Sequence, residues 1–244
     1  MAKKRRSSSE LSLADILYSQ GFGTRYDCAS IVAAGAISIA GVVHDDPDEM
    51  LIPEGLVFSY RGAEWPYCEK AVIALHKPAG YECSMKPSAY PSVLNLLPGQ
   101  LRARNVQPVG RLDADTTGLL ILTDDGALQH RLIHPKRHVE KVYEVTLKHD
   151  ASPDMCAKLL AGVVLDDDPE PVAAASAVLD SERPKHLTMT LVQGKYHQVK
   201  RMIAACGNRV EALHRSRFGA YALPDDLKCG EWRWLSGPEA VLGR

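Results

Sequence analysis

The sequence predicts an α+β fold, in which a small N-terminal α/β module precedes a larger domain built on a mixed, largely antiparallel sheet. Two observations lead to this prediction. Strand-like apolar runs come from widely separated segments, and few helical patterns lie between them. Near the N-terminus, by contrast, two short helical stripes and one hairpin pattern fall within residues 10–61.

The N-terminal module is expected over residues 10–61, after a disordered basic tail at 1–9. The run AISIAGVV then predicts a hairpin that turns at Gly41. Residues 62–70 are expected to form a linker, and residues 71–244 the main domain. The two helical stripes of the module are apolar: Leu13, Ile16 and Leu17, and then Cys28, Ile31 and Val32.

Strand patterns dominate the main domain. The segment KVYEVTL has the composition of a strand, and Tyr143, Val145 and Leu147 alternate onto one face. Two helices are expected, over ALQHRLI after the turn DDG and over YHQVKRMIAAC before the stop signal GN. The predicted strands are AVIAL, GLLILT, KVYEVTL and HLTMTLV, with one or two more in RVEALHRSRFGAYAL.

Composition favours a folded protein of the cytoplasm. Of the 244 residues, 45% are hydrophobic and 24% charged, and no apolar run is long enough to span a bilayer. The opening residues MAKKRRSSSELSLADIL lack the apolar core of a secretory signal. None of the six cysteines has C-x-x-C spacing, so we expect no metal site and a reducing compartment.

Charge is unevenly distributed along the chain. The net charge is only −1, but residues 193–217 hold six Lys or Arg side chains against the single acid Glu211. Such a segment suits phosphate binding, although it is also compatible with a solvated surface. Residues 10–61 are acidic instead, with eight Asp or Glu side chains against Arg25 and Arg61.

The stretch VGRLDADTTGLLILTDDG places Arg111, Asp113 and Asp115 directly before an apolar strand. Its segment GRLDADTTGLLILTDDG resembles the catalytic motif of pseudouridine synthases, in particular the branch that modifies a uridine of small-subunit (16S) ribosomal RNA. Three more segments resemble family motifs in the expected order: ALHKPAGYECS, HPKRHVEKVYEVTL and GKYHQVKRMIAACGNRVEALHRSRFGAYAL. Residues 11–60 look like the S-four-like RNA-binding module of a small-subunit ribosomal protein.

The resemblance implies a role for each polar residue of the main motif. Asp113 matches the family's nucleophile, which attacks the nucleotide or stabilises positive charge on its sugar. Lys200 matches the cation that keeps this aspartate ionised, although most relatives have arginine there; Arg201 is the alternative. Tyr143 matches the aromatic residue that faces the nucleotide, and Arg111 is expected to fill the space left by a flipped base.

Each of these assignments has a simpler alternative. Tyr143 is also compatible with a core aromatic, Arg111 with an ion pair to Asp115, and Lys200 with a phosphate contact at the surface. The resemblance implies ribosomal RNA or a small-subunit assembly intermediate as partner, no cofactor, and a monomer. The RNA-binding residues predicted from it are Arg111, Lys195, His197, Arg201, Arg215 and Arg217.

Other functions are compatible with parts of the sequence. A synthase acting on 23S ribosomal RNA is the nearest alternative, and a non-catalytic RNA-binding or ribosome-assembly factor is a second. The stretch DADTT also fits the D-x-D-x-T motif of haloacid-dehalogenase-like phosphatases, which hold magnesium. That motif normally follows a long apolar strand, whereas only VGRL precedes it here.

Overall fold

The structure is a computed structural model that describes residues 10–166 and 168–243. The tail predicted at 1–9 lies outside the described residues. The chain divides into two compact units. The first contains the described residues up to Ala71 together with Leu97–Val106, and the second contains Val72–Leu96 and the residues from Gln107 onward.

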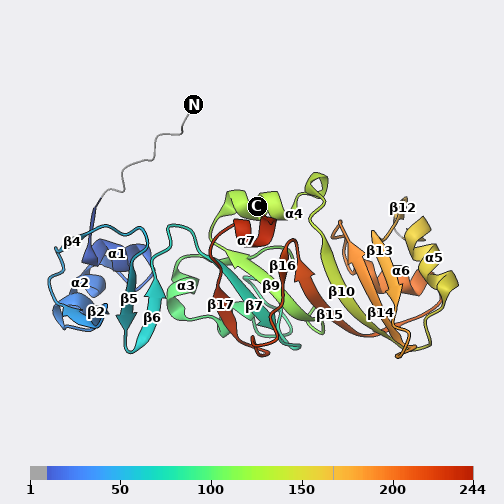
Figure 1. Cartoon of the computed structure of the whole chain (residues 1–244), viewed down its shortest axis with the longest axis horizontal. Helices are drawn as coiled ribbons and strands as arrows, with labels where there is room; N and C mark the ends of the chain where they lie inside the picture. The colour runs from blue at the N-terminus through green and yellow to red at the C-terminus, as the bar shows by residue number, and fades with distance from the viewer. Residues whose placement is uncertain (1–9, 167, 244) are drawn as a thin grey trace. The chain divides into compact units, whose positions relative to one another are not determined.

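The first unit contains the helices and the hairpin expected near the N-terminus (Figure 1). Its four-stranded sheet has the order β3-β2-β5-β6, and β1 pairs with β4. The hairpin β2–β3 turns between Ile39 and Val42, as predicted. The bounds are α1 Leu13–Ser19, α2 Arg25–Ala33, α3 Gly99–Ala103, β1 Leu11–Ser12, β2 Ile37–Ile39, β3 Val42–His44, β4 Met50–Leu51, β5 Val57–Tyr60 and β6 Ala63–Pro66.

Both N-terminal helices begin at a side-chain cap. The Ser12 hydroxyl accepts the Asp15 N–H at 3.2 Å. Thr24 and Asp27 form a capping box, in which each side chain bonds the backbone N–H of the other residue. These caps satisfy N–H groups that have no partner within the helix, and so they fix where α1 and α2 start.

The linker predicted at 62–70 is wrong for its first half. Ala63–Pro66 form strand β6, which pairs antiparallel with β5. The cause is Trp65, which is 7% exposed and packs its ring edge-on against Phe22 at a centroid distance of 5.1 Å. Aromatic burial of this kind stabilises a strand in a segment whose Pro and Gly content resembles a linker.

The second unit is built on a nine-stranded sheet with the main order β13-β14-β10-β15-β9-β7-β17. β8 adds to β9, and β16 adds to β15. Of the described pairs only β15–β9 is parallel, so the mixed, largely antiparallel sheet is confirmed. The bounds are β7 Val72–Lys77, β8 Gln107–Pro108, β9 Thr117–Thr123, β10 Lys141–Leu147, β13 Ser176–Leu179, β14 His186–Leu191, β15 Val210–Phe218, β16 Tyr221–Ala222 and β17 Trp232–Trp234.

Short helices and one small hairpin accompany this sheet. Helix α5 lies beside β13 and α6 beside β11 and β15, whereas α4 lies near β9 and α7 near β16 (Figure 1). No helix of the described part of the chain is long and apolar enough to cross a bilayer. The bounds are α4 Gly126–Ile133, α5 Pro153–Ala161, α6 Gln198–Ala205, α7 Glu239–Leu242, the 3₁₀ turns η1 Val93–Leu96 and η2 Pro135–Arg137, and the hairpin β11 Val163–Leu165 with β12 Asp168–Val172.

The parallel pair β9–β15 in the middle of the sheet depends on Gly118. This residue has φ +105° and lies opposite Arg215 in the register. A Cβ atom at position 118 would lie 2.3 Å from the Arg215 carbonyl oxygen. Only glycine therefore lets the two strands approach, and this contact joins the strand after Asp113 to the C-terminal part of the sheet.

We expect Gly118→Ala to lower the free energy of unfolding by at least about 2 kcal/mol, because the strands must separate and the backbone is strained. Urea denaturation measures this change. Gly126→Ala is the matched control, since a Cβ there meets nothing within 4 Å, and it should be neutral or slightly stabilising. Equal stability of both variants would contradict the described strand approach.

Candidate active site

Asp113 lies in the loop that leads into β9, and the buried Lys77 at the end of β7 holds this loop. The Lys77 side chain is 0% exposed. Its Nζ donates to the carbonyl oxygens of Pro78 at 2.9 Å, Ala114 at 3.3 Å and Thr116 at 2.8 Å. Two of these acceptors, Ala114 and Thr116, closely follow Asp113 in the sequence, so Lys77 fixes the backbone just after the carboxylate.

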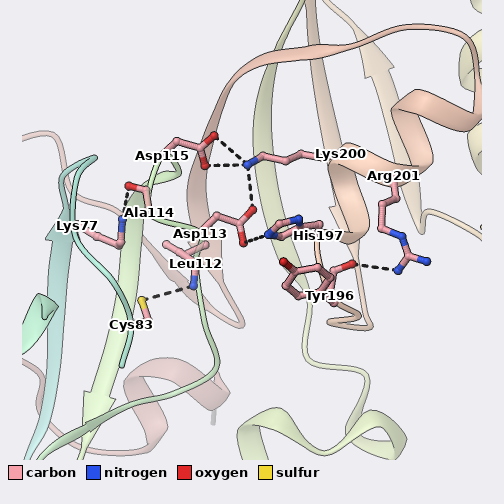
Figure 2. Close-up of polar contacts among 10 residues, drawn as sticks. All are labelled: Lys77, Cys83, Leu112, Asp113, Ala114, Asp115, Tyr196, His197, Lys200 and Arg201. Carbon is pink, nitrogen blue, oxygen red and sulfur yellow. Dashed lines mark hydrogen bonds and ion pairs between the residues drawn. The ribbon is translucent and has the colours of Figure 1, made fainter. Parts of the chain in front are cut away.

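Lys77 also places a positive charge beneath the loop. Burial lowers the pKa of its ammonium group, and the nearby groups Cys83, Asp115 and Asp113 partly offset this effect. The Cys83 sulfur accepts the backbone N–H of Leu112, the residue before Asp113, at 3.5 Å (Figure 2). The turn before β9 is thus anchored on both sides of Asp113.

The carboxylate of Asp113 contacts two basic side chains. Its Oδ1 lies 3.2 Å from Nε2 of His197, and its Oδ2 lies 3.1 Å from Nζ of Lys200. Figure 2 shows both side chains pointing at Asp113 from the segment that begins α6. The Asp113 side chain remains 26% exposed, so a carboxylate held by two nitrogen groups still faces solvent.

Lys200 bridges two carboxylates. Besides Asp113, its Nζ lies 2.7 Å and 2.9 Å from the two oxygens of Asp115. Burial opposes the charged form of Lys200, but its bonds to both aspartates outweigh burial and raise its pKa. Burial likewise opposes the charged form of Asp115, but Lys200 lowers the pKa of that carboxyl. Lys200 is therefore a firmly protonated cation between two carboxylates.

The backbone before α6 decides which basic residue reaches Asp113. The helix begins at Gln198, two residues later than predicted, because His197 adopts the left-handed conformation with φ +47°. Arg201 lies one position further along and its Nη1 donates to the Tyr196 carbonyl at 3.1 Å. Of the two alternatives left open by the sequence, the structure pairs Lys200 with Asp113.

Asp113 opens into a cavity of about 860 Å³, a size that accommodates a nucleotide-like ligand. Tyr143 lines it from β10, where it lies opposite Met189 on one side and Arg215 on the other. The pairing with β15 shifts register between Val142 and Tyr143, which re-aims the ring. The predicted residues that line this cavity are Arg111, Asp113, Tyr143, Lys195, His197, Lys200 and Arg215.

The predicted RNA-binding residues are not equivalent in the structure. Arg111 is exposed and Lys195 half-buried at the cavity, whereas Arg217 is exposed elsewhere. Arg215 is only 1% exposed, and its Nε donates to the Leu119 carbonyl at 2.8 Å. This burial places Arg215 in the wall of the active-site cavity and not on the outer surface, and its role in RNA binding stays a prediction. The alternation of β15 turns Arg215 onto the inner face, and charge alone did not reveal this.

Arg215 and Lys141 form a buried pair of cations beside the cavity. The Arg215 guanidinium lies 5.0 Å and the Lys141 ammonium 5.5 Å from the centre of the Phe218 ring. Among the described residues, neither forms an ion pair with a carboxylate. Burial, together with the nearby Arg215 charge, lowers the pKa of Lys141 to about 8. Lys141 Nζ donates to the Val139 carbonyl at 2.8 Å.

This lowered pKa predicts a change of stability with pH. Between pH 8 and the ordinary lysine value the unfolded chain binds more protons at Lys141, so its contribution to stability rises with pH. Lys141→Met should remove that rise and relieve up to roughly 3 kcal/mol of destabilisation at pH 7. Urea denaturation of both proteins at pH 7 and 9.5 measures the difference. The same pH dependence in both proteins would contradict a depressed Lys141 pKa.

Comparison with known proteins identifies the family. The family model for RNA pseudouridylate synthases matches residues 71–205, more than half of the chain. The chain belongs to this family. The matched segment contains Asp113, Tyr143, His197 and Lys200, which line the cavity, and Lys77, which holds the Asp113 loop.

Individual relatives of the synthase agree with this identification. The ribosomal small subunit pseudouridine synthase A of Vibrio parahaemolyticus is 38% identical over 216 residues, covering 88% of this chain and 92% of its own. The Escherichia coli protein of the same name is 42% identical over 165 residues, covering 68% and 70%. A crystal structure of a pseudouridylate synthase is 33% identical, with a TM-score of 0.65 over 95% of this chain and 99% of its own.

Membership of the synthase family decides against the phosphatase alternative. A D-x-D-x-T phosphatase carries its motif at the end of a strand in a Rossmann-like sheet. In this synthase Asp113 instead precedes β9, which lies in a largely antiparallel sheet. The stretch DADTT therefore matches the phosphatase motif in sequence but not in its position in the fold.

Sequence reasoning missed Lys141 and Lys77 of the synthase site, and it predicted His197 only as an RNA-binding residue. Lys141 had a detectable signal, because it shares the inward face of KVYEVTL with Tyr143 and Val145. Lys77 had a weaker signal, because it is the last residue of an apolar strand. The contact of His197 with Asp113 had none, since it depends on a left-handed backbone conformation.

Proposed function

We propose that this synthase converts a specific uridine of small-subunit ribosomal RNA into pseudouridine, with Asp113 acting on the sugar of the flipped-out nucleotide. The observation that carries the proposal is the Asp113 carboxylate, held by Lys200 and His197 at a cavity that Tyr143 also lines. These contacts fix the orientation of the carboxylate at the cavity, where the sugar carbon of the bound nucleotide is expected to lie.

The reaction is an isomerisation, and its atoms balance without another reactant. The bond between the sugar C1′ and the base N1 breaks, and a bond between C1′ and C5 forms. The proton that leaves C5 is matched by one that N1 gains. No electron, group donor or metal enters this balance, so the expectation of no cofactor follows from the chemistry.

Asp113 has two possible ways to assist this exchange. Its carboxylate attacks C1′ and forms a covalent intermediate, or it stabilises positive charge on the sugar while the base turns over. In both cases the oxygen must be charged and correctly aimed. Lys200 and His197 each hold one oxygen, and Lys77 holds the loop behind them.

Tyr143 and Arg111 are suited to binding the extruded base and the bases that it leaves. A uridine in folded RNA is stacked, so the enzyme must extrude it before reaching C1′. The Tyr143 ring, 8% exposed at the cavity wall, offers a face for the extruded uracil, and its hydroxyl offers a proton route. The exposed Arg111 guanidinium at the same cavity suits stacking on the bases that stay behind.

The small ribosomal subunit is favoured as target by the names of the relatives, which are ribosomal small subunit pseudouridine synthases. This favours 16S over the 23S alternative. The first unit is proposed to assist RNA binding despite its acidic composition, together with the basic residues at 3–6. A cytoplasmic monomer acting on this RNA or on an assembly intermediate completes the proposal.

Pseudouridine mapping tests the proposed function. Ribosomal RNA is mapped from cells that lack the gene and from cells complemented with wild-type or Asp113→Asn protein. We expect one small-subunit pseudouridine to disappear on deletion and to return only with the wild-type chain. Loss of a site in the large-subunit RNA would favour the 23S alternative, and an unchanged map would contradict both.

A further inference from the structure

A second cavity of the same unit is strongly basic. It has a volume of about 440 Å³ and lies where the segment Arg131–Glu140 meets the end of β15 and α7. We call it the basic pocket. Its cationic lining consists of Arg131, Lys136, Arg137 and Arg217, with His138 beside them and Glu140 as the acid.

The cations of the basic pocket are not neutralised by the protein. Among the described residues, none of the side chains of Arg131, Lys136, Arg137 and Arg217 forms an ion pair with a carboxylate. Four cations elsewhere in this unit do have such partners: Lys158 with Asp154, Arg183 with Asp180, Arg209 with Glu211 and Arg233 with Asp226. A concave cluster of unpaired cations is the surface that attracts a phosphate group.

The basic pocket has a fixed frame. Nδ1 of His134 accepts the N–H of Lys136 at 3.2 Å, and its carbonyl accepts the N–H of Arg137 at 2.9 Å. On the opposite wall, Arg217 Nε donates to the Gly219 carbonyl at 2.9 Å. These bonds hold the backbone that carries the cations, so their arrangement is set before any ligand arrives.

Gly219 allows α7, the third wall of the basic pocket, to lie close to the end of β15. It has φ +57°, and a Cβ atom there would lie 2.3 Å from the Val241 carbonyl oxygen. The Ala220 N–H donates to the same carbonyl at 2.8 Å. Val241 and Leu242 of α7 thereby close the pocket behind the cations.

The basic pocket and the candidate active site share their dividing wall. Ile133 and Pro135 line the active-site cavity, whereas Arg131 and Lys136 of the same segment line the basic pocket. On β15, Phe218 lines the active-site cavity, whereas its neighbour Arg217 lines the basic pocket. The two cavities therefore adjoin across one segment of the chain and one strand.

We propose that the basic pocket binds backbone phosphate of the substrate RNA outside the target nucleotide. The inference rests on the proposed function, because it takes the occupant of the active-site cavity to be a nucleotide of RNA. Binding there needs no base contact. The pocket sets the register and orientation of the strand, and the active-site cavity carries out the chemistry.

A pair of matched double variants tests the proposal. Lys136→Gln with Arg137→Gln removes two charges from the basic pocket. Lys148→Gln with Lys185→Gln removes two from exposed lysines outside both cavities. Affinity for a small-subunit ribosomal RNA transcript is measured against salt, and single-turnover rate at saturating RNA.

We expect the pocket variant to bind roughly tenfold or more weakly at low salt. Its log–log salt slope should be shallower by about 0.7–0.9 for each lost phosphate contact. Its rate at saturation should stay that of the wild type, and the control should change little in either respect. Equal effects in the two variants, or a loss of rate at saturating RNA, would overturn the proposal.

The wild-type protein separates the two hypotheses in the same experiment. If the wild type forms no pseudouridine either in the transcript or in a small-subunit assembly intermediate, the proposed function fails, whatever the variants do. If the wild type reacts normally and the pocket variant keeps its affinity and salt slope, the proposed function stands and the basic pocket fails.

Discussion

Asp113→Asn is expected to abolish pseudouridine formation while leaving the fold intact. The amide has the same shape, but it neither attacks C1′ nor carries the negative charge that stabilises the sugar. A loss of at least about 10⁴-fold is expected, as for the removal of other catalytic nucleophiles. Single-turnover assays on a small-subunit RNA transcript measure it, and urea denaturation checks the fold.

Asp115→Asn is the matched control for this variant. Both aspartates bond Lys200, but Asp113 lines the active-site cavity and Asp115 does not. The control should therefore keep most of the rate. Activity of Asp113→Asn above a few per cent of wild type would remove Asp113 from its proposed role, and equal losses in both variants would point to the Lys200 bridge alone.

The main strands of the second unit were predictable because their apolar alternation records which face is buried. In β10 the inward residues Tyr143, Val145 and Leu147 are all at most 8% exposed. β9 could be predicted for a different reason. It is a central strand, and its apolar run Leu119–Leu122 is buried on both faces of the sheet. Strands whose side chains form the core can therefore be predicted from the apolar pattern of their own sequence.

Elements that depend on distant contacts left no such pattern. Helix α5, by contrast, does have local signals, a Ser152 cap followed by Pro153 at the start of the helix, and sequence reasoning missed it. The short helix α3 belongs to the first unit although it lies at Gly99–Ala103, and Arg104 beside it bonds Gln20 at 2.6 Å. Sequence order alone cannot reveal that a segment returns to an earlier unit.

The site was predictable where residue type determines chemistry, and not where geometry does. A carboxylate beside a cation, Asp113 with Lys200, was inferred from motif resemblance alone. The bridge from Lys200 to Asp115 and the contact of His197 with Asp113 depend on how two loops face each other. Arg215 illustrates the same limit, since its charge suggested RNA while its strand position buries it.

Lys200→Met should slow the chemical step without weakening RNA binding. The change keeps most of the stem but removes the donor to Oδ2 of Asp113, and it leaves two neighbouring carboxylates with no cation between them. Removal of one such electrostatic group typically costs about 10²–10³ in rate. Lys200→Arg keeps the charge, so we expect it to restore much of the single-turnover rate.

RNA affinity distinguishes the two possible roles of Lys200. A lysine committed to two carboxylates neutralises no phosphate, so the salt dependence of binding should be the same in Lys200→Met and wild type. Arg201→Met is a useful comparison, because Arg201 lies on the same helix and does not pair with Asp113. If Lys200→Met instead keeps its rate at saturating RNA and its salt slope falls by about 0.7–0.9, Lys200 is a phosphate contact. Asp113 must then be held by His197 alone, because Arg201 points at the Tyr196 carbonyl.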